Sequence, residues 1–205
     1  MPGIIKNNKA VQVKIDMYTQ LTKFITDRVA IDDEQLKLVL SYFKPLTLKK
    51  NEVINIVGNP ARRMYFVNKG CLRVFFLKVN GAEVTRRFAF ENTFSTSLTS
   101  FISGEPLMEC TKAIETTELL YISRNDFYHL LDVIPAWEKF YRNYLEFAYV
   151  NNTKRLQSFA TQDAAERYKL LLKESPHIVL RLSNKLVANY LNISQEALSR
   201  LKSKI

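Results

Sequence analysis

The chain has 205 residues, which is enough for one large domain or for two small domains that each bury a core. Its 30 Lys and Arg residues exceed its 20 Asp and Glu residues, and the formal net charge of +10 favours a polyanionic partner such as nucleic acid or an anionic membrane surface. No apolar run approaches the roughly 18 to 20 residues that span a bilayer, and the N-terminus lacks the apolar core of a secretory signal. We therefore expect a cytoplasmic protein of two domains with no membrane-embedded part.

Cysteine and histidine are scarce in this chain, with two residues of each. Cys71 and Cys110 are the only cysteines, and they do not form a C-x-x-C pair. We expect both thiols to be reduced and structural, because a free cysteine behaves as a small buried hydrophobic residue. His129 and His177 stand in unrelated segments with no nucleophile beside them, and there is no Gly-rich loop to cradle a phosphate. The sequence therefore predicts no metal, no cofactor and no enzymatic activity.

The N-terminal part of the chain is predicted to be helical. Residues 1–14 are polar and basic and are expected to form an arm before the first helix. The pattern over residues 16–28 predicts that helix. Asp32 or Asp33 then opens a second helix, which stops before Pro45. These two helices are expected to form a small cap on the domain that follows.

After this cap the pattern changes to short strands divided by turn residues. Asn80-Gly81 predicts a two-residue hairpin connection, because such a connection needs positive φ angles that Asn and Gly adopt cheaply. Gly70 is expected to serve a similar turn. About seven short strands in succession predict an antiparallel roll or barrel. The predicted strands cover residues 46–48, 52–57, 64–68, 71–79, 82–90, 110–114 and 119–123.

A long helix is predicted from Pro135 to about Phe159, with neither Gly nor Pro inside it. At 1.5 Å per residue it would be about 35 to 40 Å long. Two apolar strips run along it, and a helix packed into a single core needs only one. We expect one strip to pack on the roll and the other on a second copy of the chain. The first strip contains Trp137, Phe140, Tyr141, Tyr144 and Ala148, and the second contains Leu145, Tyr149, Asn152, Leu156 and Phe159.

The last 45 residues contain further helices. Gln162 and Asp163 begin one helix, which Pro176 is expected to end, and HIVLRL is predicted to be a short extended piece. Ser183 is suited to cap the helix that follows, and Asn192 can end that helix in a left-handed conformation. Ser194 is then placed to cap a final helix after a three-residue turn. The small residue Ala188 would let the two helices cross closely.

The final helix has an apolar side and a polar side. Arg can bridge two acceptors of guanine, Glu accepts a hydrogen bond from cytosine, and Gln can pair with adenine. This polar side therefore favours a helix-turn-helix whose second helix reads base edges, while an ordinary helical hairpin with a solvated face is the alternative. The residues of the polar side are Gln195, Glu196, Ser199, Arg200 and Ser203.

The order of these parts resembles the superfamily of the cyclic-AMP receptor protein and the fumarate-nitrate-reduction regulator over nearly the whole chain. The resemblance rests on MYFVNKGCLRVFF, VTRRFAFENTF, ISRNDFYHLLDVIPAWEKFYR and LSNKLVANYLNISQEALSRLK in that order. It implies an α+β fold, with a cyclic-nucleotide-binding-like antiparallel β-roll and helical cap over residues 1–134, a long dimerisation helix over 135–160 and a helix-turn-helix domain over 161–205. The implied partners are double-stranded DNA, a second copy of the chain and, in the roll, a small-molecule effector.

The resemblance also assigns roles to individual residues of the C-terminal motif. Gln195, Glu196 and Arg200 occupy its three base-reading positions, and Ser183 and Ser194 stand at the helix starts that face phosphates. Ser199 shares the polar side of the same helix.

The roll departs from the pattern of members that bind cyclic nucleotides. Those members use a Gly-Glu-Leu turn and, farther on, an Arg-Ser or Arg-Thr pair. Here Thr96 and Ser97 stand where Gly and Glu would be, and Leu107 and Met108 stand where Arg and Ser would be. A buried phosphodiester without a cationic partner costs several kcal/mol, so we expect no binding of cyclic AMP or cyclic GMP.

Two arrangements remain open for this degenerate effector pocket. Its apolar residues can close on one another as ordinary core, or they can line a pocket for an apolar or mixed small ligand. These residues are Phe94, Leu98, Phe101, Leu107 and Met108.

The leading functional hypothesis is a homodimeric transcriptional regulator that reads two half-sites about 34 Å apart. The alternative from another class is a ligand-sensing or protein-interaction module whose helix-turn-helix has become a packing element. The salt dependence of DNA affinity separates the two, because phosphate contacts make affinity fall steeply with ionic strength.

Overall fold

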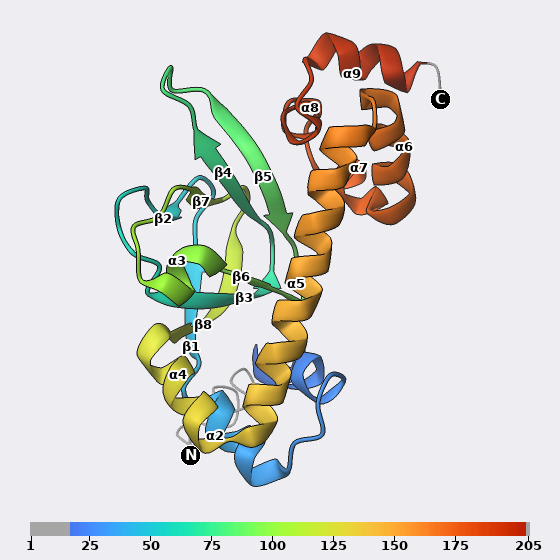
Figure 1. Ribbon diagram of the computed structural model, residues 1–205. Helices are drawn as coiled ribbons and strands as arrows, with labels where there is room; N and C mark the ends of the chain where they lie inside the picture. The colour runs from blue at the N-terminus through green and yellow to red at the C-terminus, as the bar shows by residue number, and fades with distance from the viewer. Residues whose placement is uncertain (1–16, 204–205) are drawn as a thin grey trace, which may run out of the picture. The chain divides into compact units, whose positions relative to one another are not determined.

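The structure is a computed structural model that describes residues 17–203 (Figure 1). The chain divides into two compact units. The roll unit consists of the chain up to Arg73 together with Phe88–Tyr144, and the helical unit consists of Val74–Arg87 and the chain from Leu145 onward. The predicted N-terminal arm, residues 1–14, lies outside the described residues.

Two helices precede the strands, as predicted. The first occupies residues 17–26, and the second is α2 (Asp33–Ser41). The Asp32 carboxylate accepts a hydrogen bond from the backbone amide of Gln35 at 2.8 Å, so it satisfies one of the donors left open at the start of α2. Asp32 therefore opens the second helix, as its position in the sequence indicates.

The strands form two four-stranded antiparallel sheets, with the orders β1-β8-β3-β6 and β2-β7-β4-β5. The predicted antiparallel roll is thereby confirmed. In the described residues the strands are β1 (Lys44–Leu48), β2 (Val53–Asn55), β3 (Arg63–Lys69), β4 (Leu72–Leu77), β5 (Glu83–Ala89), β6 (Thr93–Ser95), β7 (Cys110–Ala113) and β8 (Thr117–Ser123).

Side chains from both sheets meet in one apolar cluster inside the roll unit. Burying a side chain of this size stabilises the fold by about 1.5 to 3 kcal/mol relative to leaving it in water, which is why the two sheets stay closed on each other. Gly70 makes the tight turn between β3 and β4 at a φ of 93°, and a Cβ there would lie 2.7 Å from the Thr116 carbonyl oxygen. The cluster contains Leu48, Tyr65, Val67, Leu72, Ala89, Ala113 and Leu119.

The hairpin between β4 and β5 forms where predicted, but its turn is different. The Lys78 amide donates to the Ala82 carbonyl and the Gly81 amide donates to the Lys78 carbonyl, both at 2.9 Å. The loop is therefore three residues long, and Gly81, with φ of 79°, takes a left-handed conformation that Asn80 does not. The expectation of a two-residue turn with two positive φ angles was wrong, because one glycine is enough for the three-residue loop.

Three short elements of the roll unit were not predicted from the sequence: β6, α3 (Leu98–Ser103) and α4 (Arg124–Val133). β6 and α3 are too short to show a clear hydrophobic period. No element was predicted between the last strand and Pro135, where α4 lies. It is a separate helix because Ile134, at φ −126° and ψ 98°, is extended, as expected for a residue that precedes proline.

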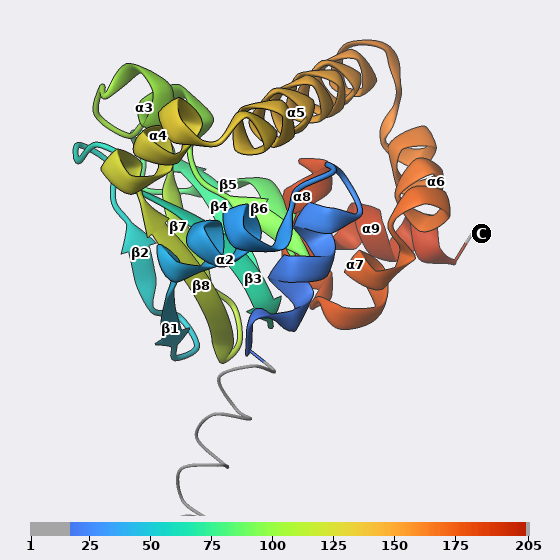
Figure 2. The same ribbon diagram turned by 90° about the horizontal axis from the view of Figure 1, so that it is seen from below.

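The long helix is α5 (Pro135–Thr161), and its 27 residues make it about 40 Å long. Its first turns pack into the roll unit, where Trp137 and Phe140 are stacked with ring centroids 4.8 Å apart. The Phe127 ring of α4 meets Trp137 edge-on at 5.3 Å. Figure 2 shows α3 and α4 beside each other in this unit. The first part of the predicted strip, Trp137, Phe140 and Tyr141, is thus buried in the roll unit, as expected.

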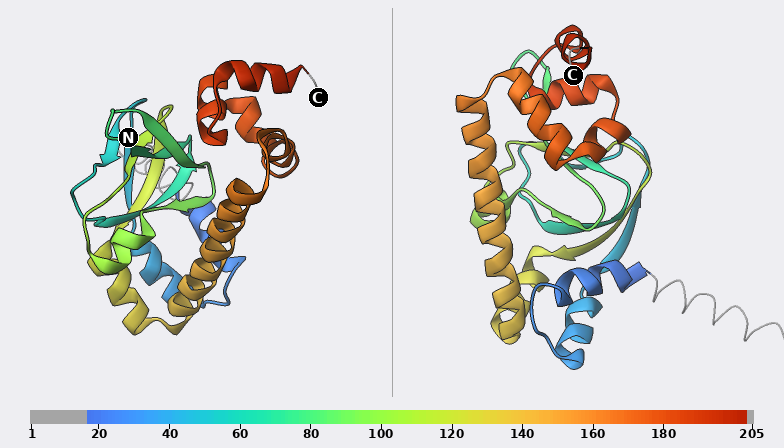
Figure 3. Two further views of the ribbon diagram at one scale, coloured as in Figure 1. Left: turned by 45° about the horizontal axis from the view of Figure 1, so that its top comes forward. Right: turned by 90° about the vertical axis from the view of Figure 1, so that its right-hand side faces the viewer.

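Four helices follow α5 in the helical unit, seen in orange and red in Figure 3. They are α6 (Ala164–Glu174), α7 (Pro176–Arg181), α8 (Asn184–Leu191) and α9 (Gln195–Lys202). Asp163 and Glu166 form a capping box at the start of α6. The prediction of an extended piece after Pro176 was wrong. Proline is favoured at the first position of a helix, and Pro176 starts α7 there as well as ending α6.

Candidate nucleic-acid interface

The pair α8 and α9 is held by local capping contacts at each predicted position. The Ser183 hydroxyl accepts from the Leu186 amide at 3.4 Å, and the Ser194 hydroxyl accepts from the Ala197 amide at 3.1 Å. Between the helices Asn192 has φ 57° and ψ 45°, the left-handed conformation that ends α8. The turn is therefore determined by residue types that are visible in the sequence.

The two helices pack through a small apolar interface. Val187 and Leu198 are fully buried, and Ala188 and Leu191 are nearly so. Because Ala188 carries only a methyl group, α8 and α9 can approach closely at this point. The apolar side of α9 is thus buried against α8, and its opposite side is available to solvent or a partner.

The opposite side of α9 forms the reading face, defined here as Gln195, Glu196, Ser199 and Arg200. All four side chains are exposed. The pKa of the Glu196 carboxyl lies below its usual value because its own backbone amide and, second, the Ser194 hydroxyl donate hydrogen bonds to it. Glu196 is therefore a charged acceptor at neutral pH, which suits the amino group of cytosine.

A contact that the sequence did not reveal joins α9 to the start of α8. The Lys202 ammonium donates a 2.6 Å hydrogen bond to the Asn184 side chain. Asn184, Lys185 and Lys202 are all exposed, so the helix pair carries two cations outside the reading face. Such cations are suited to contact phosphates, which fix the position of a protein on a duplex without reading sequence.

A second unexpected contact lies inside the helical unit, between α8 and the edge strand β5. The Asn189 side-chain oxygen accepts from the Thr85 amide at 2.7 Å and from the Thr85 hydroxyl at 2.5 Å, while its amino group donates to the Glu83 carbonyl at 2.7 Å. The carboxamide thus pairs with the backbone of β5 as another strand would. This contact is called the Asn189 clamp below.

The predicted dimer stripe lies on the part of α5 that belongs to the helical unit. Tyr149 is 73% exposed and Leu156 is 72% exposed, values that are unusual for large apolar side chains. Asn152 is also exposed, whereas Leu145 is half-buried. Phe159, at 36%, is only partly free because the guanidinium groups of two arginines lie over its ring.

The predicted effector residues do not all meet in one place. Phe94 is 3% exposed and packs edge-on against Phe24, Phe66 and Phe140, so it belongs to an aromatic cluster with the first helix and α5. Thr96 is buried and its hydroxyl donates to the Arg63 carbonyl at 3.0 Å. Ser97 is buried at the start of α3, and Leu98 is half-buried.

The remaining effector residues lie after α3. Leu107 is buried, and its backbone is paired on both sides, because its amide donates to the Asn59 carbonyl at 2.8 Å and its carbonyl accepts from the Gly58 amide at 3.0 Å. Met108 is 76% exposed, so it takes no part in the predicted closed core. The expectation that all five apolar side chains are buried as ordinary core was wrong for Met108, whereas Phe94 is buried.

Polar groups around α3 are satisfied within the roll unit. The Ser100 hydroxyl donates to the Glu105 carbonyl and accepts from the Ala61 amide at 2.8 Å. In the C-terminal half of α3 the Arg124 guanidinium donates to the carbonyls of Phe101 at 2.6 Å and Ile102 at 3.0 Å. Phe101 itself is fully buried against the Phe127 ring. This segment is therefore closed by its own contacts.

Two buried charged residues of the roll unit were missed in the sequence. Arg73 on β4 is 4% exposed and Glu109, just before β7, is 3% exposed. Both make interactions within the protein. The strand pattern CLRVFF gave no sign of a buried arginine, because a single charge in an apolar strand normally marks the solvent side.

Comparison with known proteins decides which fold this is. Residues 45–133 match the family described as the cyclic nucleotide-binding domain. The c-di-GMP-responsive global regulator CLP of Xanthomonas campestris is similar with a TM-score of 0.67 at 17% identity, over 84% of this chain and 91% of that chain. The catabolite activator protein of Thermus thermophilus is similar with a TM-score of 0.56 at 20% identity, over 92% of this chain and 85% of that chain. FixK2 of Bradyrhizobium japonicum is similar with a TM-score of 0.65 at 18% identity, over 79% of this chain and 83% of that chain.

The fold is that of the CRP/FNR regulators. The resemblance stated from the sequence is thus confirmed, both for the order of the parts and for the roll. No curated protein matches the chain. Within residues 17–203 no helix has the length and apolar character needed to cross a membrane, and no cluster of three or more His, Cys, Asp and Glu side chains could hold a metal ion.

The structure shows where Leu107 and Met108 of the degenerate effector pocket lie in this fold. Leu107 and Met108 stand in a segment whose backbone pairs with residues 58–60, one side chain buried and the other pointing to solvent. Neither can supply the positive charge that a cyclic phosphate needs.

Proposed function

We propose that the protein is a homodimeric, sequence-specific DNA-binding transcriptional regulator. The observation that carries this proposal is the reading face of α9, which is fully presented to solvent on a helix whose other side is buried against α8. Arg200, Glu196 and Gln195 supply the donors and acceptors that distinguish base pairs in the major groove. The formal net charge of +10 supports a polyanionic partner.

The dimer is supported by the exposed stripe on α5. Tyr149 and Leu156 place large apolar surfaces in water on one side of the helix, and pairing with a second copy of α5 would bury them. Two copies of α9 related by a two-fold axis would then read half-sites about 34 Å apart.

We further propose that the roll of this regulator binds neither cyclic AMP nor cyclic GMP. The support is the apolar pair Leu107 and Met108, which the family resemblance aligns with the phosphate-binding Arg-Ser pair, together with the internal hydrogen bonds that close the α3 segment. DNA binding should then need no added nucleotide. Effector control, if the roll has it, would come from an apolar or mixed small molecule.

The salt dependence of binding to a random-sequence DNA duplex tests the first proposal. Anisotropy titrations from 50 to 200 mM salt should show affinity falling by about a thousandfold or more if several phosphates are contacted. Affinity that is absent or independent of salt would instead favour the alternative, a sensing or protein-interaction module. Calorimetry with millimolar cyclic AMP and cyclic GMP tests the second proposal, and saturable heat from either nucleotide would contradict it.

A further inference from the structure

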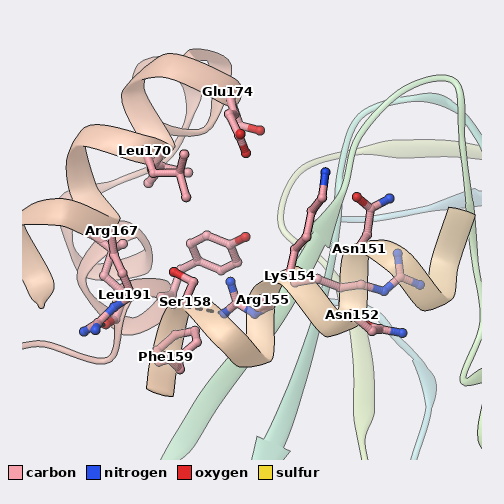
Figure 4. A pocket seen from close by; sticks show the side chains of 14 residues that line it. Asn151, Asn152, Lys154, Arg155, Ser158, Phe159, Arg167, Leu170, Glu174 and Leu191 are labelled. Atoms are coloured by element: carbon pink, nitrogen blue, oxygen red, sulfur yellow. Dashed lines mark hydrogen bonds between the residues drawn. The ribbon is translucent and has the colours of Figure 1, made fainter. Parts of the chain in front are cut away.

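The helical unit contains a pocket that none of the proposed functions uses. Its volume is about 280 Å³, and its lining comes from β5, α5, α6 and α8. Figure 4 shows the side chains of Arg155, Arg167 and Phe159 grouped in it, with Glu174 apart from both guanidinium groups. Four cationic residues and a single acidic one contribute to the lining. The pocket is therefore strongly electropositive.

Two of these cations are held over aromatic rings. The Arg155 guanidinium carbon lies 4.0 Å from the centre of the Tyr190 ring and 4.8 Å from that of Phe159. The Arg167 guanidinium carbon also lies 4.8 Å from the centre of the Phe159 ring. The same ring thus brings two like charges together, and the rings restrict both side chains to fixed positions.

The simplest role for the two arginines is to cap the C-terminal end of α8, and they do so in part. Arg155 donates to the Tyr190 carbonyl at 3.1 Å, and Arg167 donates to the Leu191 carbonyl at 3.2 Å and to the Gln162 carbonyl at 2.6 Å. Each guanidinium has five N–H donors, so this capping occupies a minority of them. The Arg167 Nε atom is buried and has no hydrogen-bond partner within the described chain. Capping alone therefore does not supply acceptors for all the N–H donors of the two guanidinium groups.

The site is also short of negative charge. Within residues 17–203 no carboxylate oxygen lies within 4 Å of either guanidinium. Desolvation by burial lowers the pKa of Arg155, and the nearby charges of Arg86 and Arg167 lower it further, while the Tyr190 hydroxyl opposes the shift. Because a guanidinium does not lose its proton in proteins, the cost of this crowding stays in the folded state until an anion neutralises it.

We propose that this pocket binds a small molecule carrying a phosphate group, held by the guanidinium groups of Arg155 and Arg167. A guanidinium offers a planar fork of donors that matches two phosphate oxygens, and two such forks fixed side by side can bind one group from two directions. The volume exceeds that of a single phosphate and approaches the lower end of small-molecule pockets. Since both arginines also donate to the end of α8, the ligand would contact the helix pair that carries the reading face. The inference does not depend on DNA binding.

Calorimetry and thermal unfolding of the full chain with inorganic phosphate as the probe test this site. The unmodified protein should show saturable heat and a rise in melting temperature with phosphate, and neither with chloride. Arg167→Gln should weaken phosphate binding by about tenfold or more, because it removes a charge-assisted fork of hydrogen bonds. Lys169→Gln is the matched control, since it removes the same charge from an exposed position on the same helix. It should leave phosphate binding unchanged.

Two further measurements serve as controls for loss of local structure and for phosphate contacts made by DNA. Arg167→Lys retains the positive charge but loses the planar fork of donors. The Arg167→Lys protein should therefore bind phosphate better than the Arg167→Gln protein. DNA titrations in phosphate-free buffer identify the source of the phosphate. If the arginines serve the DNA backbone, Arg167→Gln weakens DNA binding as strongly as it weakens phosphate binding. Equal losses in both assays, equal effects of Arg167→Gln and Lys169→Gln, or no saturable heat would each overturn the proposal.

Discussion

The α3 segment of the roll unit and the outward faces of α5 and α9 in the helical unit differ in how far their side chains find partners within the protein. In the roll unit the aromatic side chains pack on one another, and the polar groups of α3 are satisfied by Ser100 and Arg124. In the helical unit large apolar side chains of α5 face water, and the reading face of α9 is exposed. The difference indicates that the α3 segment is closed by its own contacts, while the faces of α5 and α9 present the groups that the proposed partners would cover.

The largest expected effect is dissociation of the proposed dimer. Leu156→Asp would bury one unpaired carboxylate per subunit at the seam, and each such charge costs roughly 3 to 5 kcal/mol. Sedimentation velocity at micromolar concentration should show a dimer for the unmodified protein and a monomer for the variant. Gln157→Asp, at the next exposed position and off the stripe, should remain dimeric. A monomeric unmodified protein would show that the stripe is misassigned.

The second largest expected effect is on the free energy of unfolding, and it tests whether the α3 segment of the roll unit is closed by its own contacts. Phe101→Ala removes a fully buried ring between α3 and α4 and should lower the free energy of unfolding by about 3 to 5 kcal/mol. Ile102→Ala, at a neighbouring side chain that is 47% exposed, should cost about 0.5 kcal/mol or less. Urea unfolding followed by the fluorescence of Trp137, the single tryptophan, reports on this unit. Similar small costs for both variants would mean that the segment is loosely packed and open to a ligand.

The reading face should respond more modestly and more selectively. Arg200→Ala should weaken binding to the preferred sequence by about 1 to 3 kcal/mol and relax the preference at one base pair of each half-site. Lys202→Ala removes an exposed cation from the same helix and should weaken binding to all sequences alike. Glu196→Ala should change which base is preferred more than it changes affinity. If Arg200→Ala also weakens all sequences alike, Arg200 contacts a phosphate.

The smallest expected effect concerns the Asn189 clamp. Asn189→Ala removes the hydrogen bonds to Thr85 and Glu83 and should cost about 1 to 2 kcal/mol, because the edge of β5 regains water in their place. Hydrogen exchange at the Thr85 amide should become faster. Asn184→Ala loses only an exposed contact with Lys202 and should leave that amide unchanged. Unchanged exchange in both variants would mean that the clamp does not persist in solution.

The sequence predicted best what is determined locally. Ser183, Asn192 and Ser194 fix the two helix starts and the turn by contacts within three residues, so the helix-turn-helix could be located in advance. Pro176 was ambiguous for a local reason, since proline both ends one helix and begins another. The long α5 was recognised because no residue in it breaks a helix.

Other features depend on contacts between distant positions and left no local signal. Asn189 meets Thr85 across 104 positions of the chain, and Asn is equally common on solvated helix faces. Arg155 and Arg167 come together only because α6 folds back near α5. Met108 was expected either to be buried as core or to line an apolar pocket because it is apolar, although only the path of the backbone decides whether such a side chain is buried. Pairings of this kind need the fold before they can be predicted.

Selection of bound sequences from random DNA, with no nucleotide added, is the most direct test of sequence-specific DNA binding by a dimer. We expect enrichment of a two-fold symmetric site with half-sites about 10 base pairs apart, since two copies of α9 read successive turns of the duplex. We also expect the same site and the same enrichment when cyclic AMP or cyclic GMP is supplied. No enrichment, or enrichment that appears only with a cyclic nucleotide, would contradict this expectation.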